Sequence, residues 1–382
     1  MKHIDRQILQ IALPSIVSNI TVPLLGLIDV AIVGHLGSPA YIGAIAVGGM
    51  LFNIIYWIFG FLRMGTSGMT SQAYGKRDLP EIVRLLMRSV GIGLAVALCL
   101  ILLQVPIRQT AFLIIHPTAE VREMATLYFH ICIWGAPAML GLYGLSGWFI
   151  GMQNSRIPMY IAITQNIVNI IASLSFVCFF KMKVEGVAFG TLIAQYAGFI
   201  MGLVLWMSRY GKLKKYILWK GVLQKEAMMR FFQVNRDIFL RTLCLVTVTL
   251  FFTSAGASQG EIILAVNTLL MQLFTLFSYV MDGFAYAGEA LSGRYIGARN
   301  RKAFTNTTRH LFIWGGWLAA FFTLVYALGG NAFLGLLTDN KDVVSAAGTY
   351  FYWALAIPVA GIAGTAFSSA LRQHAACWHP WQ

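Results

Sequence analysis

The sequence predicts an all-α integral membrane protein with about ten transmembrane helices arranged as two lobes. Of its 382 residues, 58% are hydrophobic and 11% carry a charge, and the mean hydropathy is +0.71. A soluble domain carries about 25% charged residues, which its water-facing surface requires. Apolar runs of about 20 residues recur along the chain, and each is long enough to cross a hydrocarbon core of about 30 Å as a helix.

Ten apolar segments are long enough to be transmembrane helices. In chain order, we expect these spans near residues 8–33, 42–70, 85–107, 124–150, 157–180, 184–208, 236–257, 262–292, 310–336 and 345–367. The longer segments exceed the minimum length, so we expect their helices to tilt or bend. The first segment runs past the length of a signal peptide and contains Asp29, so we expect no cleaved signal peptide.

The net charge of +14 reflects membrane topology rather than nucleic-acid binding. With the N-terminus in the cytoplasm, 22 of the 28 Lys and Arg residues fall on inner segments or at the inner ends of spans, five fall on outer segments, and Arg63 lies well within a span. This asymmetry is the positive-inside pattern. It predicts that residues 209–230, between the sixth and seventh spans, are cytoplasmic. It also makes anionic lipid headgroups, and not nucleic acid, the expected charged partner.

The sequence contains no pattern typical of an enzyme or a metal site. The five cysteines form no CxxC pair, and the seven histidines are scattered without an HExxH-like spacing. Neither a phosphate-binding glycine loop nor a recognisable nucleophile–base set is present. A membrane enzyme acting on lipids would need a clustered catalytic set. We therefore predict that the protein is not an enzyme and uses no cofactor.

The two halves of the chain match at an offset of about 222 residues. SQAYGKRD at 71–78 aligns with GRYIGARN at 293–300, and Tyr128 aligns with Tyr350. Six spans return the first half to its starting side, so the second half begins in the same orientation. The pattern predicts parallel repeats related by an axis along the membrane normal.

The repeat predicts two six-helix lobes, of which the second is incomplete. We expect an N-lobe of helices 1–6, a basic cytoplasmic linker, a partial C-lobe of helices 7–10 and an off-pattern tail: residues 1–208, 209–230, 231–367 and 368–382. A complete second lobe would need two more spans. We therefore expect the chain to be truncated at its C-terminus.

Three of the 14 acidic residues lie well within the predicted spans: Asp29, Asp282 and Glu289. A carboxylate at membrane depth costs roughly 2.5–3.5 kcal/mol, which makes such a residue a candidate for function. Asp29 is the candidate ion-coupling residue, although its place in the last turns of its span also allows it to reach water. Asp282 and Glu289 are seven residues apart on one helix face, where they can line a cleft and attract a cation. Alternatively, Glu289 pairs with an arginine at the inner surface.

Five motifs follow one another along the chain. They are DVAIVGHLG at 29–37, GFLRMGTSGMTSQAYGKRD at 60–78, GMQNSRIP at 151–158, VNRDIFLRTL at 234–243 and DGFAYAGEALSGRYIGARN at 282–300. Together they resemble the multidrug and toxic compound extrusion (MATE) family, and most of all its DNA-damage-inducible, DinF-like branch. The resemblance covers residues 5 to about 367 and ends before the tail.

This resemblance implies an exporter of organic, often cationic, compounds that is driven by an inward flux of protons or sodium ions. By match to the family's motifs, Asp29 is the coupling carboxylate of the first helix, and Pro14 is the proline that bends this helix. Asn169 and Thr191 match polar site residues of the fifth and sixth helices, and Ser173 stands where many members have a second aspartate. Asn169 and Ser173 are four residues apart and therefore share one helix face.

We predict an ion-coupled antiporter of the bacterial cytoplasmic (inner) membrane that exports small organic, mainly cationic, molecules by alternating access and acts as a monomer. The alternatives are a lipid-linked oligosaccharide flippase of the same superfamily and a non-transporting truncated remnant. A flippase would need a more basic cleft for a pyrophosphate headgroup, whereas Arg63 is the single arginine placed at membrane depth. With Ser173 in the second position, one carboxylate remains, and this favours protons over sodium ions as the coupling ion.

The charge asymmetry makes the topology testable. We expect a cysteine introduced at residue 38 to react with a membrane-impermeant maleimide from outside the cell, and a cysteine introduced at residue 216 to stay protected, since the linker is cytoplasmic. Labelling of intact cells measures this, and permeabilised cells, in which both should react, are the control. Equal labelling of both positions from outside would contradict the topology.

Overall fold

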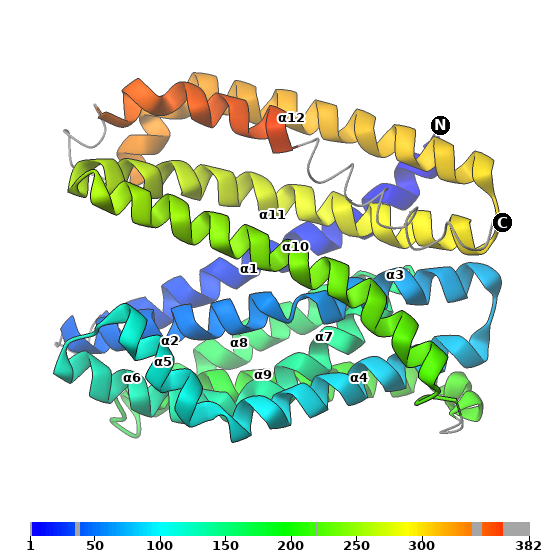
Figure 1. Ribbon diagram of the computed structural model, residues 1–382, viewed down its shortest axis with the longest axis horizontal. Coiled ribbons are helices and arrows are strands. Elements are labelled where there is room, and N and C mark those ends of the chain that lie inside the picture. The colour runs from blue at the N-terminus through cyan, green and yellow to red at the C-terminus, as the bar shows by residue number, and fades with distance from the viewer. Residues whose placement is uncertain (1, 35–38, 218–220, 338–345, 362–382) are drawn as a thin grey trace. The chain divides into compact units, whose positions relative to one another are not determined.

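A computed structural model describes residues 2–34, 39–217, 221–337 and 346–361, and Figure 1 shows it as a ribbon. This part of the chain forms helices and contains no strand, as the all-α prediction requires. The α-helices are α1 (Lys2–Gly34), α2 (Pro39–Ile58), α3 (Phe61–Lys76), α4 (Leu79–Leu102), α5 (Gln104–Ile115), α6 (Ala119–Cys132), α7 (Ala136–Gly151), α8 (Arg156–Cys178), α9 (Val184–Tyr210), α10 (Lys225–Ser258), α11 (Glu261–Gly297) and α12 (Arg301–Leu337). Two 3-10 helices are η1 (Ile133–Gly135) and η2 (Gly211–Tyr216), and residues 346–361 are also helical. The predicted tail, 368–382, lies outside the described residues.

Seven stretches of the described helices are long and apolar enough to cross a membrane: Ala40–Lys76, Leu79–Leu102, Ala119–Gly151, Arg156–Cys178, Val184–Tyr216, Ala265–Gly297 and Arg301–Gly329. They correspond to seven of the ten predicted spans. The other three predicted spans fall on α1, α10 and the helical residues 346–361. The chain is therefore a helical membrane protein that crosses the bilayer several times.

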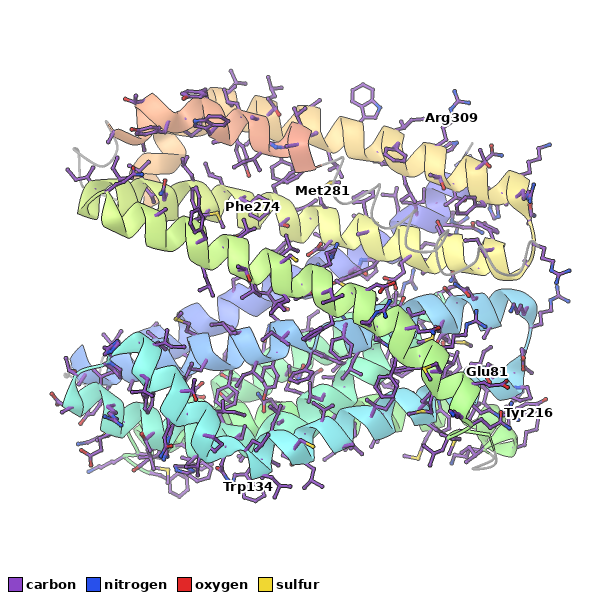
Figure 2. All side chains as sticks on the ribbon, viewed as in Figure 1. Glu81, Trp134, Tyr216, Phe274, Met281 and Arg309 are labelled. Carbon is purple, nitrogen blue, oxygen red and sulfur yellow. The ribbon has the colours of Figure 1, made fainter. Side chains whose placement is uncertain are left out.

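Large apolar side chains are exposed on the surface, as a protein embedded in lipid requires. Trp134, Phe251 and Leu328 are each more than half exposed. Figure 2 shows the labelled Trp134 at the edge of its helices, pointing outwards. Soluble monomers rarely expose large apolar patches. Hydrocarbon tails can cover such side chains, so the exposed apolar surface agrees with the predicted spans.

Two of the longer predicted spans are each built from two helices. The span near 42–70 is divided between α2 and α3 by a turn in which the Gly60 amide donates to the Trp57 carbonyl oxygen at 3.1 Å. The span near 124–150 is divided between α6 and α7 by η1, and Pro137 lies in the first turn of α7. Proline has no N–H to continue a preceding helix, and its fixed φ suits the start of a new one.

The described residues belong to two compact units. One lies within Met1–Asn19 and Leu240–Gln382, and the other lies within Ile20–Phe239. The predicted lobes, 1–208 and 231–367, have different boundaries, because the units divide inside α1 and α10 and not in a loop. Each of these two helices therefore contributes one half to each unit.

Polar contacts fix the first half of α1 within its unit. The Asp5 carboxylate accepts hydrogen bonds from His310 Nδ1 at 2.8 Å and from Trp314 Nε1 at 3.1 Å, both on α12. Gln7 Oε1 accepts a hydrogen bond from the Tyr295 hydroxyl of α11 at 2.7 Å. The hydrogen bond from His310 lowers the pKa of the Asp5 carboxyl group, which precedes the first span. These contacts hold the start of α1 against α11 and α12.

In the other unit, helices approach one another closely where a glycine permits it. A Cβ atom on Gly147 of α7 would overlap with the carbonyl oxygen of Arg63 on α3, so the two helices touch through their backbones. In lipid no hydrophobic force drives helices together, and van der Waals contact between such small surfaces holds them. The next two residues of α7, Trp148 and Phe149, have completely buried side chains.

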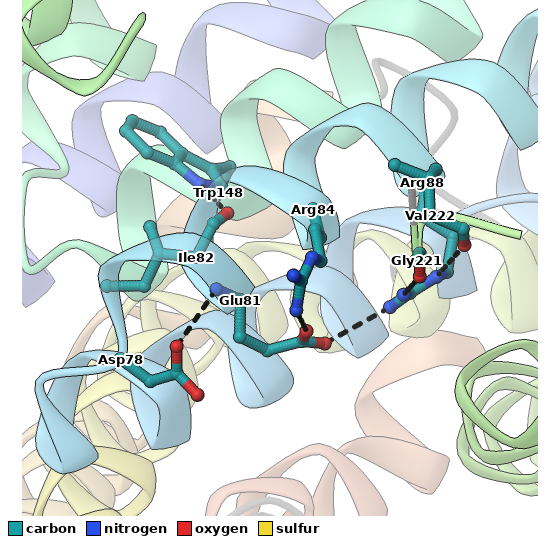
Figure 3. A network of polar contacts seen from close by, with 8 residues as sticks. All are labelled: Asp78, Glu81, Ile82, Arg84, Arg88, Trp148, Gly221 and Val222. Carbon is teal, nitrogen blue, oxygen red and sulfur yellow. Dashed lines mark hydrogen bonds and ion pairs between the residues drawn. The ribbon is translucent and has the colours of Figure 1, made fainter. Parts of the chain in front are cut away.

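The start of α4 is fixed by two hydrogen bonds that Figure 3 shows from close by. The Asp78 carboxylate accepts a hydrogen bond from the Glu81 amide at 3.1 Å and so caps the helix. The indole Nε1 of Trp148 on α7 donates to the Ile82 carbonyl oxygen at 2.9 Å. The first turn of α4 is therefore held both by its own cap and by its neighbour.

Arg88 of α4, which belongs to the same network of polar contacts, holds the linker against this helix. Its buried guanidinium donates from Nε to the Val222 carbonyl oxygen at 3.0 Å and from Nη2 to the Gly221 carbonyl oxygen at 3.4 Å. Its Nη1 atom forms an ion pair with Glu81 at 3.3 Å, and Glu81 also pairs with Arg84 at 3.7 Å. One charged side chain thus holds backbone groups that lie more than 130 residues further along the chain.

We expect Arg88→Met to loosen the linker. The substitution leaves the carbonyl oxygens of Gly221 and Val222 without their donor, and an unsatisfied buried polar group costs about 1–3 kcal/mol. Trypsin digestion of inside-out vesicles measures the effect, and we expect cleavage after Lys225 to become several-fold faster. Arg156→Met, at an exposed position at the start of α8, should leave the rate unchanged. Equal rates for Arg88→Met and the unsubstituted protein would show that the linker does not depend on this contact.

Candidate functional site

A hydrogen bond from Asn166 holds the second half of α1 against α8. The Nδ2 atom of Asn166 donates to the Thr21 carbonyl oxygen at 3.1 Å. The predicted topology makes these helices the first and fifth spans, which would run in the same direction across the membrane. Asp29 is eight residues beyond Thr21, and Ser173 is seven beyond Asn166. With a rise of 1.5 Å per residue, this topology predicts that Asp29 and Ser173 each lie about 10–12 Å beyond the hydrogen bond, at a similar depth.

Three of the residues that the family motifs indicated meet between α8 and α9. Asn169 Nδ2 donates to Thr191 Oγ1 at 3.0 Å, and Ser173 Oγ donates to Asn169 Oδ1 at 3.5 Å. The side chains of Asn169 and Ser173 are completely buried. Lipid offers no hydrogen-bond partner, and these three side chains provide one another with some of the hydrogen bonds that they need.

Gly190 on α9 allows this contact between the two helices. A Cβ atom on Gly190 would lie 2.8 Å from the Ser173 backbone nitrogen and 2.9 Å from its Cα atom, and it would overlap with the hydroxyl oxygen. Rotation of a side chain cannot relieve a clash with backbone atoms. The approach of α9 to α8, and with it the hydrogen bond between Asn169 and Thr191, therefore requires glycine at this position.

Asp29 on α1 is 6% exposed. A carboxylate that reached water, the alternative left open by its place in the sequence, would be exposed. Its Oδ1 atom is buried and has no hydrogen-bond partner among the residues that the structure describes. A buried negative charge without a partner is costly. The position is therefore suited to binding a proton or a small cation.

Two residues of α6, Tyr128 and Cys132, lie in the neighbourhood of Asp29. Both are buried, and both lie within electrostatic range of the Asp29 carboxyl group. Tyr128 also lies beside the Thr191 side chain, so it connects Asp29 with the pair formed by Asn169 and Thr191. The sequence did not mark either residue as part of the site. A signal was nevertheless present, because Tyr128 is a matched position of the internal repeat.

The remaining residues singled out from the sequence lie in the other compact unit. Pro14 is in the first half of α1, and Asp282 and Glu289 are in α11. Helix α1 stays helical through Pro14. Asp282 and Glu289 are partly buried, and Asp282 lies within electrostatic range of Tyr279. The hydrogen bonds that join Asn169, Ser173 and Thr191 do not involve these three residues.

Tyr128 connects the polar residues that the motifs indicated. It lies within electrostatic range of the Asp29 carboxyl group and beside the Thr191 side chain, which is bonded to Asn169. Asp29 supplies the one carboxylate among these residues. In the described ranges, no group of three or more His, Cys, Asp or Glu side chains is placed to hold a metal ion.

Comparison with known proteins finds relatives along most of the chain. The MatE family model matches residues 14–174 and 238–376. DNA damage-inducible protein F of Escherichia coli (strain K12) is 37% identical over 362 residues, which cover 94% of this chain and 78% of that protein. Protein DETOXIFICATION 45, chloroplastic, of Arabidopsis thaliana is 24% identical over 365 residues, which cover 89% of this chain and 64% of that protein.

The fold of the chain is also similar to that of a solved MATE structure. The crystal structure of MATE in the bent conformation is similar with a TM-score of 0.86 and 19% sequence identity, and the match covers 97% of this chain and 83% of that chain. At this level of identity the likeness concerns the fold alone. The helices described above therefore form the fold of a MATE protein.

We expect Gly190→Ala to lower the thermal unfolding midpoint of the purified protein. The added methyl group meets the Ser173 backbone, and such overpacking costs about 1–3 kcal/mol. Gly91→Ala on α4 is the matched control, because a Cβ atom there meets nothing within 4 Å. Unfolding in a neutral detergent, followed by circular dichroism, compares the two variants. Equal midpoints would contradict the close contact of α8 and α9.

Proposed function

The chain belongs to the MatE family, and from this we propose that it is an ion-coupled antiporter that exports small organic, mainly cationic, compounds by alternating access. The family and its DinF-like branch agree with the motifs in the sequence. MATE proteins are transporters, and this supports our proposal that the residues around Asp29 bind an ion. We place the protein in the bacterial cytoplasmic membrane, with its N-terminus inside, as a monomer.

The observation that supports proton coupling is the buried Oδ1 atom of Asp29, which lacks a hydrogen-bond partner among the described residues. The neighbouring amide and hydroxyl groups of Asn169, Ser173 and Thr191 bond with one another. A negative charge in these surroundings is poorly solvated, and a bound proton removes it. Asp29 can therefore take up a proton in one conformation and release it in another that admits water.

Sodium is the weaker candidate for the coupling ion. A sodium ion that leaves water needs several oxygen ligands, and negative charge among them offsets the lost hydration. Here Ser173 stands where many family members have a second aspartate, so the site has one carboxylate. A sodium ion would also have to compete for Asn169 Oδ1, which accepts a hydrogen bond from Ser173 Oγ at 3.5 Å. A proton needs neither a second carboxylate nor additional oxygen ligands.

Through helix α1, a change of charge at Asp29 can affect other parts of the protein. An ion drives transport when two conformations bind it with different affinity. The half of α1 that carries Asp29 is bonded to α8 through Asn166, and the other half is bonded to α11 and α12. A change of charge at Asp29 alters the cost of burying its half of the helix. Pro14 removes one helical hydrogen bond in the other half, and we assign it the role of bending point.

Acidic groups at membrane depth favour a cationic substrate. Asp29 lies in one unit, and Asp282 and Glu289 lie in α11 of the other, whereas Arg63 is the basic residue at that depth. The chain also contains 16 Met and 26 Phe residues. Flexible thioether and aromatic side chains can repack around compounds of varied shape. These features suit an exporter with several substrates better than a flippase of pyrophosphate-linked sugars.

We expect Asp29→Asn to abolish export and to leave membrane insertion unchanged, because asparagine keeps the shape of the side chain but cannot exchange a proton. Transport of a fluorescent organic cation is measured in vesicles under an imposed pH gradient or an imposed sodium gradient alone. The unsubstituted protein should respond to the pH gradient only, and Asp29→Asn should fall to the rate of empty vesicles.

Three outcomes of this experiment would contradict the proposal. Export driven by sodium alone would show that the coupling ion is not the proton. Unchanged pH-driven export by Asp29→Asn would remove Asp29 from the mechanism. Absence of transport by the unsubstituted chain under both gradients would favour a non-transporting protein.

Ser173→Asp tests the choice of ion at the same site. A second carboxylate should increase any dependence on sodium, since it adds the charge that a sodium site lacks here. Ser173→Asn is the matched control, because it fills the same space beside Gly190 without charge. Sodium-driven transport that is equal in the two variants would mean that Ser173 does not set the ion preference.

A further inference from the structure

The cytoplasmic end of α9 carries a cluster of basic residues that the transport proposal does not use. Arg209, Lys212, Lys214 and Lys215 are exposed on the last turn of α9 and on η2. No Asp or Glu residue occurs in the sequence between Glu185 and Glu226. We propose that the segment Arg209–Tyr216 is a binding surface for the headgroups of anionic phospholipids.

The inward-facing residues of this segment fix the orientation of its lysines. Tyr210 and Leu213 pack against the hydrophobic core of their unit. The Tyr210 ring lies 5.0 Å from the Trp148 ring, centroid to centroid, and the Tyr210 hydroxyl accepts a hydrogen bond from Asn154 Nδ2 at 3.2 Å. Since these anchors alternate with the lysines, the charged ends are directed away from the core.

The chain beyond this segment is also held in place. Arg88 binds the carbonyl oxygens of Gly221 and Val222, as Figure 3 shows. The segment is thus fixed at one end by Tyr210 and Leu213 and is followed at the other by an anchored stretch of linker. A surface that is already ordered loses less conformational freedom when it binds a ligand.

The location of the segment at the end of a membrane-spanning stretch indicates that its partner is lipid. It continues α9 directly, and Val184–Tyr216 forms one stretch that is long and apolar enough to cross a membrane. Just before the basic residues, Ile200, Val204 and Met207 are exposed, as side chains that face acyl chains are. A basic cluster directly after such a surface lies at the level of the headgroups, where anionic lipids attract it. Nucleic acid or an acidic protein would not contact the apolar side chains.

Thermal unfolding of the full chain in a neutral detergent tests the proposal. Phosphatidylglycerol and phosphatidylcholine of the same chain length are added in separate titrations. A ligand that binds the folded state raises the unfolding midpoint. We expect a larger rise with phosphatidylglycerol, and we expect high salt to reduce the difference because the contact is electrostatic.

The triple variant Lys212→Gln, Lys214→Gln, Lys215→Gln should lose at least half of the rise that is specific to phosphatidylglycerol. The matched control is Lys76→Gln, Arg156→Gln, Lys302→Gln, which removes the same charge from three exposed positions elsewhere. The control should keep the response. These positions are exposed, so both variants should fold.

Three results would overturn the assignment. Equal loss in the two triple variants would mean that overall charge, and not this segment, attracts the lipid. Equal midpoints with the two lipids would mean that the segment does not select anionic headgroups. An equal effect of soluble glycerol phosphate would mean that the segment binds free anions and not lipid. The measurement does not involve transport, so its outcome is independent of the proposed antiport.

Discussion

The dominant constraint on this protein is that a polar group within the bilayer must find its partner in the protein, because hydrocarbon offers none. The side chains of Asn169, Ser173 and Thr191 meet this demand by bonding with one another, and Asn166 meets it by bonding with the backbone of α1. At Asp29 Oδ1, which has no hydrogen-bond partner among the described residues, a buried oxygen can still bind a proton or a cation. The proposed ion coupling would use this remaining capacity.

Close helix packing makes these hydrogen bonds possible. At Gly147 and Gly190 one helix touches the backbone of its neighbour, and a larger residue would separate the two. Since packing between helices in lipid depends on such contacts, the same glycines that hold the unit together also set the distances between polar groups. Stability and site geometry therefore share the same residues. A substitution that loosened α8 from α9 would be expected to disturb the Asn169–Thr191 pair before it unfolded the chain.

The two compact units share helices α1 and α10 instead of meeting only at a linker. The linker itself is fastened to α4 through Arg88 and is followed by the half of α10 that belongs to the same unit. Each of these helices thus contributes residues to both units, and Asp29 lies on one of them, in the half that belongs to Ile20–Phe239.

The sequence by itself indicated the membrane class, the helical spans and the family, and it named Asp29, Asn169, Ser173 and Thr191 as site candidates. Hydropathy is a local property of 20 or so neighbouring residues, and a carboxylate in an apolar run is visible without knowing its surroundings. Only the tertiary structure showed that Tyr128 lies within electrostatic range of Asp29, that Arg88 holds the linker, and that the units divide inside α1 and α10. These features depend on pairs such as Asn166 and Thr21, which are 145 residues apart. No local pattern records which distant groups will meet, because the meeting depends on how whole helices pack.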